Sequence, residues 1–432
     1  MSPRAELTTL RDGSDAFVAT LKQLEQRGEG DLSRVEPRVR AILDSVRAQG
    51  DDALRQWVQE LESRTLGQII ERNYGGKAAL DGLSQDVRGA MEHAAKRISN
   101  YHERQMRDLV GFDLEAEGVR LTSRVTPLAR VGVYAPGGKA RYPSSVLMSA
   151  LIARVAGVNE IIVATPDASA EVRAACHLSG VSAIVNAGGA QAIAALAYGT
   201  ASVPRVDKIV GPGNIYVAAA KRLVFGQVDI DSIAGPSEIL VVADASADPE
   251  LLAADLLSQA EHDEAAYPLL LSSEASHVQS VQRALDAQLE GLPRNAIARA
   301  SLTNNGFLLL VENRDRLVEI ANMLAAEHVA LHVDRPRDMA NAILRAGALF
   351  IGPQTPEAAG DYLAGPSHVL PTGGAARYAA PLGVYDFVSR SSLIEYSRSA
   401  LQAHGPDIAN FARAEGLEAH ARAVTRRTSH TE

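Results

Sequence analysis

Cysteine is nearly absent from this chain: Cys176 is the only one among 432 residues, so no disulfide can form within it. Such a chain fits a reducing compartment. Strongly basic stretches are also absent and the net charge is -9, which argues against nucleic acid and an anionic membrane surface as partners. No run approaches the roughly 20 apolar residues that span a bilayer, and the first residues lack the apolar core of a signal peptide. We therefore expect a cytoplasmic protein.

Aromatic residues are scarce at 4%, whereas apolar residues make up 46% and alanine and glycine are abundant. This composition is typical of an α/β protein, and the length allows two or three domains with a large core. The first 110 residues or so have a helical, charged pattern, with long helices predicted at 35–61 and 86–110. Residues 66–83 are rich in glycine and give no clear prediction.

From Arg130 onward the chain repeats a short apolar strand, a glycine-containing turn and an alanine-rich helix. Strands alternating with helices imply parallel sheets with crossover helices. The first series of predicted strands covers residues 131–135, 160–164, 182–185 and 207–210. After Glu238 a second series covers residues 239–243, 268–272, 306–311, 329–333 and 348–351.

A long loop rich in glycine and proline follows at residues 352–381, and loops of that length in compact domains are usually functional. The tail from residue 386 to 432 has a helical pattern. Loop and tail therefore join the strand-edge turns as places to look for functional residues.

Three glycine turns follow successive strands of the first series, at Gly137-Gly138, Gly188-Gly189 and Gly211-Pro-Gly213. Turns after parallel strands gather at the carboxyl edge of the sheet, where ligands bind. The third turn begins like a dinucleotide fingerprint, but Tyr216 stands where the third glycine belongs, and such turns also occur without any ligand. No phosphate-binding Gly-x-x-x-x-Gly-Lys-Ser/Thr sequence is present, so a P-loop ATPase is not expected.

A metal site is indicated by Gln259 and His262, three residues apart near the end of a predicted helix that starts at Pro249. An amide oxygen and an imidazole on one helix face supply half of a four-ligand site. The other half must come from distant segments: Asp361 in the long loop, with His368 as its rival, and His420 in the tail. Nitrogen and oxygen donors without thiolate suit catalytic zinc or a similar divalent ion. On spacing alone any one histidine is more often solvated or satisfied by a neighbour.

Acid–base chemistry is indicated by Glu327-His328, where a helix is predicted to end and a strand to begin. A helix C-terminus favours imidazolium, and a histidine titrating near neutrality could accept a proton from an alcohol. The pair could equally be an ordinary polar helix end. Cys176 lies among alanines in a predicted helix and is interpreted as an inert buried thiol, so any aldehyde oxidation here would use attack by water.

The sequence resembles the histidinol dehydrogenase family from about residue 35 to 420. The most specific segments follow in the family's order: Gly211-Pro-Gly-Asn-Ile-Tyr-Val217, Ile233-Ala-Gly-Pro-Ser-Glu238, Asp255-Leu-Leu-Ser-Gln-Ala-Glu-His-Asp263, Gly360-Asp-Tyr-Leu-Ala-Gly-Pro366 and Pro381-Leu-Gly-Val-Tyr-Asp-Phe387. The resemblance implies a zinc-dependent, NAD-linked enzyme with one Zn²⁺ per subunit, which oxidises the amino alcohol L-histidinol through the aldehyde to L-histidine.

The resemblance also implies roles for particular residues. Glu327 and His328 would accept protons, and Ser237 and Glu415 would contact the substrate together with this pair and the metal ligands. The metal would be held by Gln259, His262, Asp361 and His420. NAD would be contacted by Tyr134, Gln191 and Asn214.

The family is a homodimer whose tails cross, so Glu415 and His420 would act in the partner's site. The implied architecture is two Rossmann-like parallel-sheet domains, one inserted in the other, with a helical N-terminal region and a C-terminal dimerisation tail. The expected boundaries are an arm at 1–25, a first α/β domain at 26–130 with 239–381, an NAD-binding domain at 131–238 and a tail at 382–432.

The sequence departs from the family at Ala326, where proline usually precedes Glu-His, and at Ser367, where asparagine is usual. One alternative is a relative on the same scaffold that oxidises another small alcohol, such as a sulfopropanediol. Glu415 argues against it, because a carboxylate repels a sulfonate and suits an imidazole. The other alternative is a non-catalytic zinc- or nucleotide-binding protein, which the presence of Glu327 and His328 beside a full ligand set disfavours.

Overall fold

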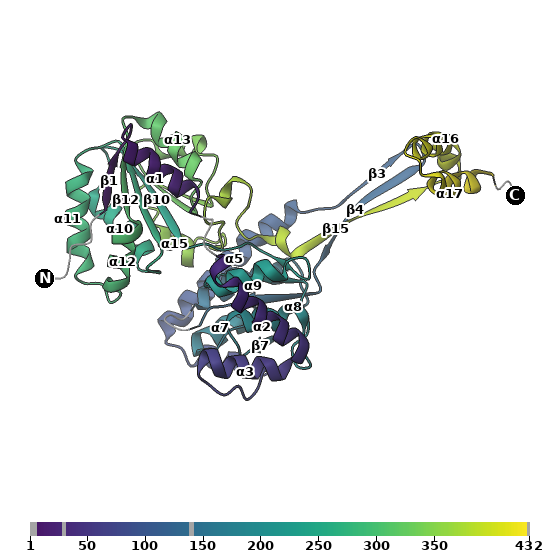
Figure 1. Ribbon diagram of the computed structural model, residues 1–432, viewed down its shortest axis with the longest axis horizontal. Coiled ribbons are helices and arrows are strands. Elements are labelled where there is room, and N and C mark those ends of the chain that lie inside the picture. Colours follow the sequence, from purple (N-terminus) through teal and green to yellow (C-terminus); the bar gives the residue numbers. More distant parts are fainter. Residues whose placement is uncertain (1–6, 28–31, 138–141, 430–432) are drawn as a thin grey trace. The chain divides into compact units, whose positions relative to one another are not determined.

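The computed structural model describes residues 7–27, 32–137 and 142–429. The chain divides into two compact units, Met1–Arg104 with Leu128–Phe387 and Gln105–Pro127 with Val388–Glu432. In the described residues the first unit contains two six-stranded, mainly parallel sheets, and the second a three-stranded antiparallel sheet (Figure 1). The predicted α/β class with two parallel-sheet domains is therefore confirmed.

One sheet of the first unit is wholly parallel and is built around β10 (Glu238–Ala243) and β13 (His328–His332). The other strands are the terminal β1 (Thr8–Arg11) and, in sequence order, β11 (Tyr267–Ser272), β12 (Phe307–Leu310) and β14 (Ala348–Ile351). Their spatial order is β1-β12-β11-β10-β13-β14. We call this the β10 sheet.

Helices cover both faces of the β10 sheet, because its central strand alternates between two cores. Ile239 and Val241 face a core shared with α10 (Pro249–Ala260), α11 (His277–Leu289) and α12 (Asn295–Asn305). Leu240 and Val242 face the opposite core, which includes side chains of α1 (Asp15–Glu25), α13 (Arg314–Leu324) and α14 (Pro336–Ala342). Continuous apolar runs such as Leu269–Leu271 are thus explained by burial on both sides.

The second sheet of this unit, the β5 sheet, has the order β2-β7-β6-β5-β8-β9. Its strands are β2 (Ile70–Glu71), β5 (Arg130–Tyr134), β6 (Glu160–Ala164), β7 (Ala183–Val185), β8 (Lys208–Val210) and β9 (Asp229–Ile230). All pairs are parallel except β2 with β7. The crossover helices are α6 (Pro143–Val155), α7 (Ala170–Leu178), α8 (Gly189–Tyr198) and α9 (Ile215–Val224).

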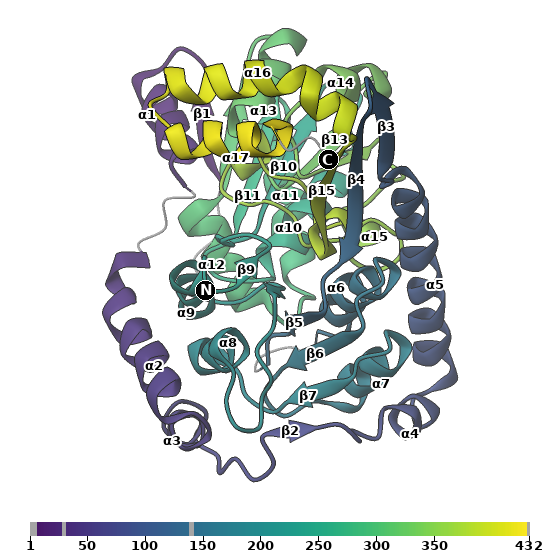
Figure 2. The same ribbon diagram turned by 90° about the vertical axis from the view of Figure 1, so that its right-hand side faces the viewer.

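The expected domain boundaries are wrong in the N-terminal third. Residues 26–130 were assigned with 239–381, but α2 (Glu36–Gln49) and α3 (Asp51–Glu62) pack on α8 and α9 of the β5 sheet (Figure 2). The short α4 (Gly76–Asp81) packs on α7, and β2 pairs with β7. The apolar stripe of α2, with Val39, Ile42 and Val46 buried, joins the same core as Ile193 and Leu196. The arm expected at residues 1–25 instead supplies an edge strand and a helix to the β10 sheet.

The second unit corrects the expectation of a purely helical tail. Strand β15 (Val388–Tyr396) pairs antiparallel with β4 (Val119–Pro127), which pairs with β3 (Phe112–Ala116). The ribbon carries the helix pair α16 (Arg398–Ala414) and α17 (Glu418–Ser429) (Figure 1). The predicted helix at 86–110 is α5 (Gln85–Asp108). Across the described ranges, no helix has both the length and the apolar character that crossing a bilayer requires.

Candidate active site

Helix α10 delivers the first two predicted metal ligands. It begins as predicted, with the Asp248 side chain accepting from the Glu250 N–H at 3.0 Å and Pro249 in the first turn. It ends at Ala260, so His262 lies in the following turn rather than on the helix face expected for it. The turn is closed by the His262 N–H, which donates to the Gln259 carbonyl at 3.1 Å. Gln259 and His262 are therefore linked by the backbone of a turn and do not share a helix face.

Gln259 and His262 differ in exposure. The Gln259 side chain is buried, and its Oε1 has no hydrogen-bond partner among the described residues. The imidazole of His262 is 42% exposed. A buried amide oxygen without a donor is costly unless a ligand satisfies it, so this atom indicates a missing electropositive group.

Asp361 lies on α15 (Glu357–Tyr362), a short helix inside the segment expected to be loop. Its Oδ2 is 4.0 Å from Nε2 of His262, and its Oδ1 is 3.6 Å from Nδ1 of His368. Burial alone would raise the pKa of Asp361, but the adjacent imidazole of His368, together with those of His328 and His262, holds this pKa below its usual value. Asp361 is therefore an ionised acceptor between two imidazoles.

These donors fit a divalent cation that binds nitrogen and oxygen. Gln259, His262 and Asp361 would supply an amide oxygen, an imidazole nitrogen and a carboxylate oxygen, the kind of donor set found at catalytic zinc. Within the described ranges, no group of three His, Cys, Asp or Glu side chains is arranged to hold a metal ion. The orphaned Oε1 of Gln259 is thus the observation that supports the site, and one further ligand is needed to complete four.

His328 opens β13 and is paired in register with Ile239 of β10. Its Nδ1 lies 3.0 Å from the carbonyl oxygen of Glu238, and since a carbonyl only accepts, Nδ1 carries the proton and Nε2 the lone pair. Burial lowers the pKa of His328 to about 4. The prediction of an imidazolium at a helix end is therefore wrong, because α13 stops at Leu324 and burial favours the neutral ring.

Glu327 precedes this histidine and is also buried. Its Oε2 accepts the Glu238 N–H at 2.9 Å, so one residue of β10 holds both members of the acid–base pair through its backbone. Burial raises the pKa of Glu327 well above its usual value, and the negative charges of Glu238 and Glu357 add to this. A carboxylate with a raised pKa is a stronger base toward water. Ser237, next to Glu238, is half-buried and its carbonyl accepts the Tyr267 N–H at 3.0 Å.

Two buried carboxylates beside the pair were missed by the sequence reasoning. Glu357 Oε1 is 3.6 Å from His328 Nδ1, and its Oε2 accepts the Ser258 hydroxyl at 3.0 Å. Burial raises the pKa of Glu357 well above its usual value. Glu238 forms a buried ion pair with Arg27. A glutamate in a first helical turn, such as Glu357, gives no signal in sequence because it is ordinarily a solvated helix-dipole residue.

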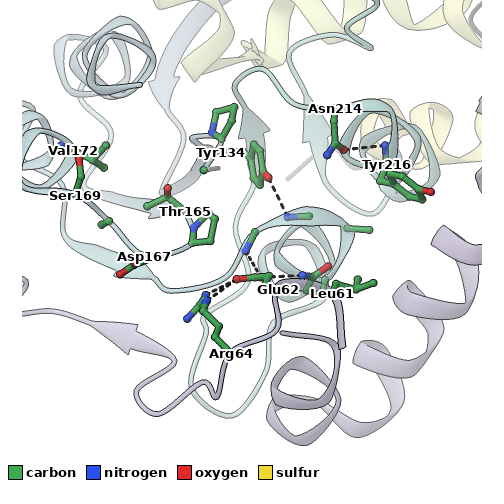
Figure 3. Close-up of a pocket in the computed structure, with 18 of the residues that line it drawn as sticks. Leu61, Glu62, Arg64, Tyr134, Thr165, Asp167, Ser169, Val172, Asn214 and Tyr216 are labelled. Carbon is green, nitrogen blue, oxygen red and sulfur yellow. Dashed lines mark hydrogen bonds and ion pairs between the residues drawn. The ribbon is translucent and has the colours of Figure 1, made fainter. Parts of the chain in front are cut away.

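The predicted cofactor residues meet at a cavity of about 1120 Å³ on the carboxyl edge of the β5 sheet (Figure 3). Tyr134, Gln191 and Asn214 all line it. The Tyr134 hydroxyl accepts the Gly189 N–H at 3.0 Å, and Asn214 caps α9 by accepting the Tyr216 and Val217 amides at 3.1 and 3.2 Å. Nearby Gly211 has φ +113°, and a Cβ there would lie 2.2 Å from the Tyr134 carbonyl oxygen. Glycine at position 211 therefore has a steric reason that does not depend on a ligand.

Three further cavity residues, Glu62, Arg64 and Asp167, were not predicted (Figure 3). Glu62 is the last residue of α3 and Arg64 follows it, so both come from the region that the sequence reasoning assigned to another domain. Asp167 follows β6 with φ +48°. The sequence did contain a signal for Asp167, because dinucleotide-binding domains often carry an acidic residue shortly after their second strand.

Glu415 and His420 belong to the second unit. Glu415 caps the end of α16, and His420 lies in the first turn of α17. Both are exposed in this chain. The first unit thus brings His262 to 4.0 Å from Asp361, with Gln259 three residues before His262. It gathers Tyr134, Gln191 and Asn214 around the cavity, while Glu415 and His420 belong to the second unit.

Paired parallel-sheet domains, a cavity of nucleotide size and a buried histidine whose Nε2 has no partner among the described residues are features of oxidoreductases of the dehydrogenase class. Comparison with known proteins identifies the family. The model of the family described as histidinol dehydrogenase matches residues 25–428. This chain belongs to the histidinol dehydrogenase family, as the sequence motifs indicated.

Individual members of this family are similar to the chain over nearly its whole length. The chain is 50% identical over 420 residues to the histidinol dehydrogenase of Syntrophotalea carbinolica, covering 96% of this chain and 97% of that protein. It is 46% identical over 424 residues to that of Cupriavidus pinatubonensis, covering 96% and 95%. The solved structure of histidinol dehydrogenase from Elizabethkingia anophelis matches with a TM-score of 0.90 and 32% identity, covering 98% of each chain.

Proposed function

We propose that this enzyme oxidises L-histidinol through L-histidinaldehyde to L-histidine, with reduction of two NAD⁺ and with Zn²⁺ bound at Gln259, His262, Asp361 and His420. The observation that carries the proposal is His328, a buried neutral imidazole whose Nε2 has no hydrogen-bond partner among the described residues, close enough to Asp361 and His262 for their charges to act on its pKa. When bound, the metal supplies positive charge that holds the substrate's amine and imidazole, and NAD supplies the hydride acceptor.

His328 performs the first proton transfer in this scheme. Its Nε2 removes the hydroxyl proton of the alcohol while the adjacent C–H bond gives up its hydrogen as hydride. The Glu238 carbonyl holds Nδ1–H and so keeps the acceptor nitrogen turned away from the strand. The low pKa of His328 keeps the ring ready to accept a proton throughout the neutral range.

Glu327 serves the second oxidation. The aldehyde must add water before it can donate another hydride, and Glu327 removes a proton from the water as its oxygen bonds to the carbonyl carbon. The buried Cys176 takes no part, because burial raises the pKa of its thiol to about 12 and leaves it protonated. Glu327→Gln should therefore oxidise the alcohol but stall on supplied aldehyde, and an unchanged aldehyde rate would refute this division of roles.

Ser237 and Glu415 are proposed to contact the substrate, with Glu415 and His420 supplied by a second copy of the chain. The second unit supports a homodimer, because its ribbon and helix pair expose large apolar side chains: Phe112 and Ile394 are each more than half exposed, and Phe411 is 71% exposed. Its buried residues are few and small, such as Ala400, Ala409 and Ala421. Such a surface is usually covered by a partner.

The reaction is tested by counting NADH formed per L-histidinol, with and without a chelator. Two NADH per substrate, lost on chelation and restored by Zn²⁺, is the expected result. One NADH per substrate, or faster turnover of a sulfopropanediol, would contradict the proposal.

The shared site is tested by mixing two inactive variants, His262→Asn and His420→Asn, after subunit exchange. If each site takes His262 from one chain and His420 from the other, every mixed dimer has one intact site of two. Since about half of the dimers are mixed after random exchange, about a quarter of wild-type activity should return. No recovery despite verified exchange would place both ligands on one chain.

A further inference from the structure

The amino end of helix α8 is occupied by the chain's own carboxylate. Glu62 Oε1 accepts the Gly188 N–H at 2.9 Å and the Gln191 Nε2 at 3.0 Å (Figure 3). The next amide, of Gly189, donates to the Tyr134 hydroxyl at 3.0 Å. In dinucleotide-binding domains the amino end of a helix at this sheet edge commonly binds phosphate. Here two of its amides already have acceptors on side chains.

Glu62 also settles which way the Gln191 amide points. A carboxylate only accepts, so the Gln191 NH₂ faces Glu62 and its Oε1 faces the other way. Gln191 is 1% exposed, lines the cavity, and its Oε1 has no hydrogen-bond partner among the described residues. A buried acceptor in a cavity wall is satisfied by a ligand that brings a donor.

The two arginines that line the described part of the cavity wall are each paired with a carboxylate. Arg64 donates to Glu62 Oε2 at 2.8 and 2.5 Å, and to the Asn186 carbonyl at 2.8 Å. Arg38 donates to Glu60 at 2.8 Å. A phosphate entering this part of the cavity would therefore find its arginines engaged by carboxylates.

Asp167 adds an exposed carboxylate to the same wall, immediately after β6. Its left-handed backbone, with φ +48°, is held by the Asp167 N–H, which donates to Asn186 Oδ1 at 3.0 Å. Strand β6 lies next to β5 and is the second strand of the β5–α6–β6 segment. The end of this second strand is where dinucleotide-binding domains meet the adenosine ribose, whose hydroxyls donate to an acidic side chain.

We propose that Glu62 is a specificity-determining residue that makes this part of the cavity accept a bare ribose diol and reject a 2′-phosphate. It blocks the amino end of α8, engages Arg64 and presents Gln191 Oε1 as an acceptor; Asp167 contributes a second negative group. The enzyme thereby selects NAD over NADP. This inference rests on the dinucleotide binding proposed above and adds the residue that sets its selectivity.

The test compares Glu62→Ala, Glu62→Gln and the wild type. Nucleotide binding is followed through the fluorescence of Trp57, the single tryptophan, which lies on α3 with Glu62, and kcat/KM is measured with each dinucleotide. Removing Glu62 frees Gly188, Gln191 and Arg64. We expect the preference for NAD over NADP to fall about 10-fold or more, since hydrogen bonds to charged groups are lost and the phosphate gains donors.

Inorganic pyrophosphate provides an independent probe of the same amides. It should compete with NAD in Glu62→Ala and not in the wild type. Glu62→Gln keeps an acceptor for the Gly188 N–H while removing the charge. Its preference for NAD over NADP should therefore lie between those of the wild type and Glu62→Ala. Asp52→Asn is the matched control, because Asp52 is an exposed carboxylate on the same helix and is not among the residues that line the cavity; its preference should be unchanged.

Two results would overturn the inference in distinguishable ways. If Glu62→Ala folds, binds NAD and keeps the wild-type preference without pyrophosphate competition, the role of Glu62 is refuted while NAD binding stands. If NAD leaves wild-type Trp57 fluorescence unchanged and supports no turnover, the proposed function fails together with the inference.

Discussion

The buried pair of Arg27 and Glu238 offers the sharpest test of how the proposed acid–base residues, Glu327 and His328, are held. Their side chains are 2% and 1% exposed. Arg27 also donates to the Leu24 and Leu324 carbonyls at 2.5 and 2.7 Å, and Glu238 Oε1 accepts the Gly373 N–H at 2.7 Å. The segment after α1, the end of α13 and the loop at Gly373 are thus tied to the first residue of β10.

The perturbation is Arg27→Met, which leaves the Glu238 carboxylate buried with the Gly373 N–H as its remaining donor. Removing one partner of a buried ion pair costs about 3–5 kcal/mol of folding free energy. The Glu238 N–H holds Glu327 and its carbonyl holds His328, so relaxation of this residue displaces both bases. A displacement of about 1 Å typically costs about 100-fold in rate. We therefore expect kcat to fall about that far while the KM for the dinucleotide is unchanged.

Urea denaturation measures the free energy of unfolding, and NADH formation at saturating substrates measures kcat. The control is Asp12→Asn, which removes the partly exposed pair with Arg316 at the edge of the same sheet and should cost less than about 1 kcal/mol without changing kcat. The double variant Arg27→Met/Glu238→Gln removes both charges, so stability should largely return. Wild-type stability and kcat in Arg27→Met, or a double variant as unstable as the single one, would refute the reasoning.

Three further outcomes are expected. The pKa of His328 is lowered from 6.5 to about 4 by burial, so between these values the unfolded chain binds more protons and the free energy of unfolding falls as pH falls; His328→Gln should flatten that slope in urea titrations, and an equal slope would contradict the assignment. Cys176→Ala should keep full turnover, and iodoacetamide should label the native thiol only after unfolding, because burial raises its pKa to about 12. Gln259→Leu should lower the bound zinc measured by elemental analysis, and wild-type metal content would exclude this amide as a ligand.

The inner strands of both parallel sheets, and the edge strand β14, could be predicted because they are apolar and punctuated by glycine, whereas the short edge strands β1, β2 and β9 were missed. Predicted strands 160–164 and 348–351 coincide with β6 and β14, and the others differ by a residue or two. The three strands of the second unit were missed for the opposite reason. Nearly every residue of β15 is exposed in this chain, so its sequence carries no alternation for a periodicity argument to detect.

Domain membership was the larger error, and its cause is physical. The helical spacing of Val39, Ile42 and Val46 predicts that α2 has an apolar face, and it does. Periodicity says nothing about which of two similar sheets that face will cover. The answer depends on complementary packing with α8 and α9, which only the folded chain shows. The same error hid Glu62, because a residue assigned to the other domain was not considered for the cofactor cavity.

The candidate site residues were chosen through motifs, whereas motifs do not predict their ionisation states. A helix end stabilises a histidine cation by about 0.3–1 kcal/mol at the surface, and that effect was the basis for expecting imidazolium. Burial acts in the opposite sense and is larger, since a pKa lowered from 6.5 to about 4 corresponds to roughly 3 kcal/mol. The helix also ends four residues before His328. The larger effect determines the chemistry: the ring is neutral, Nδ1 is committed to Glu238, and Nε2 is the atom left to accept a proton.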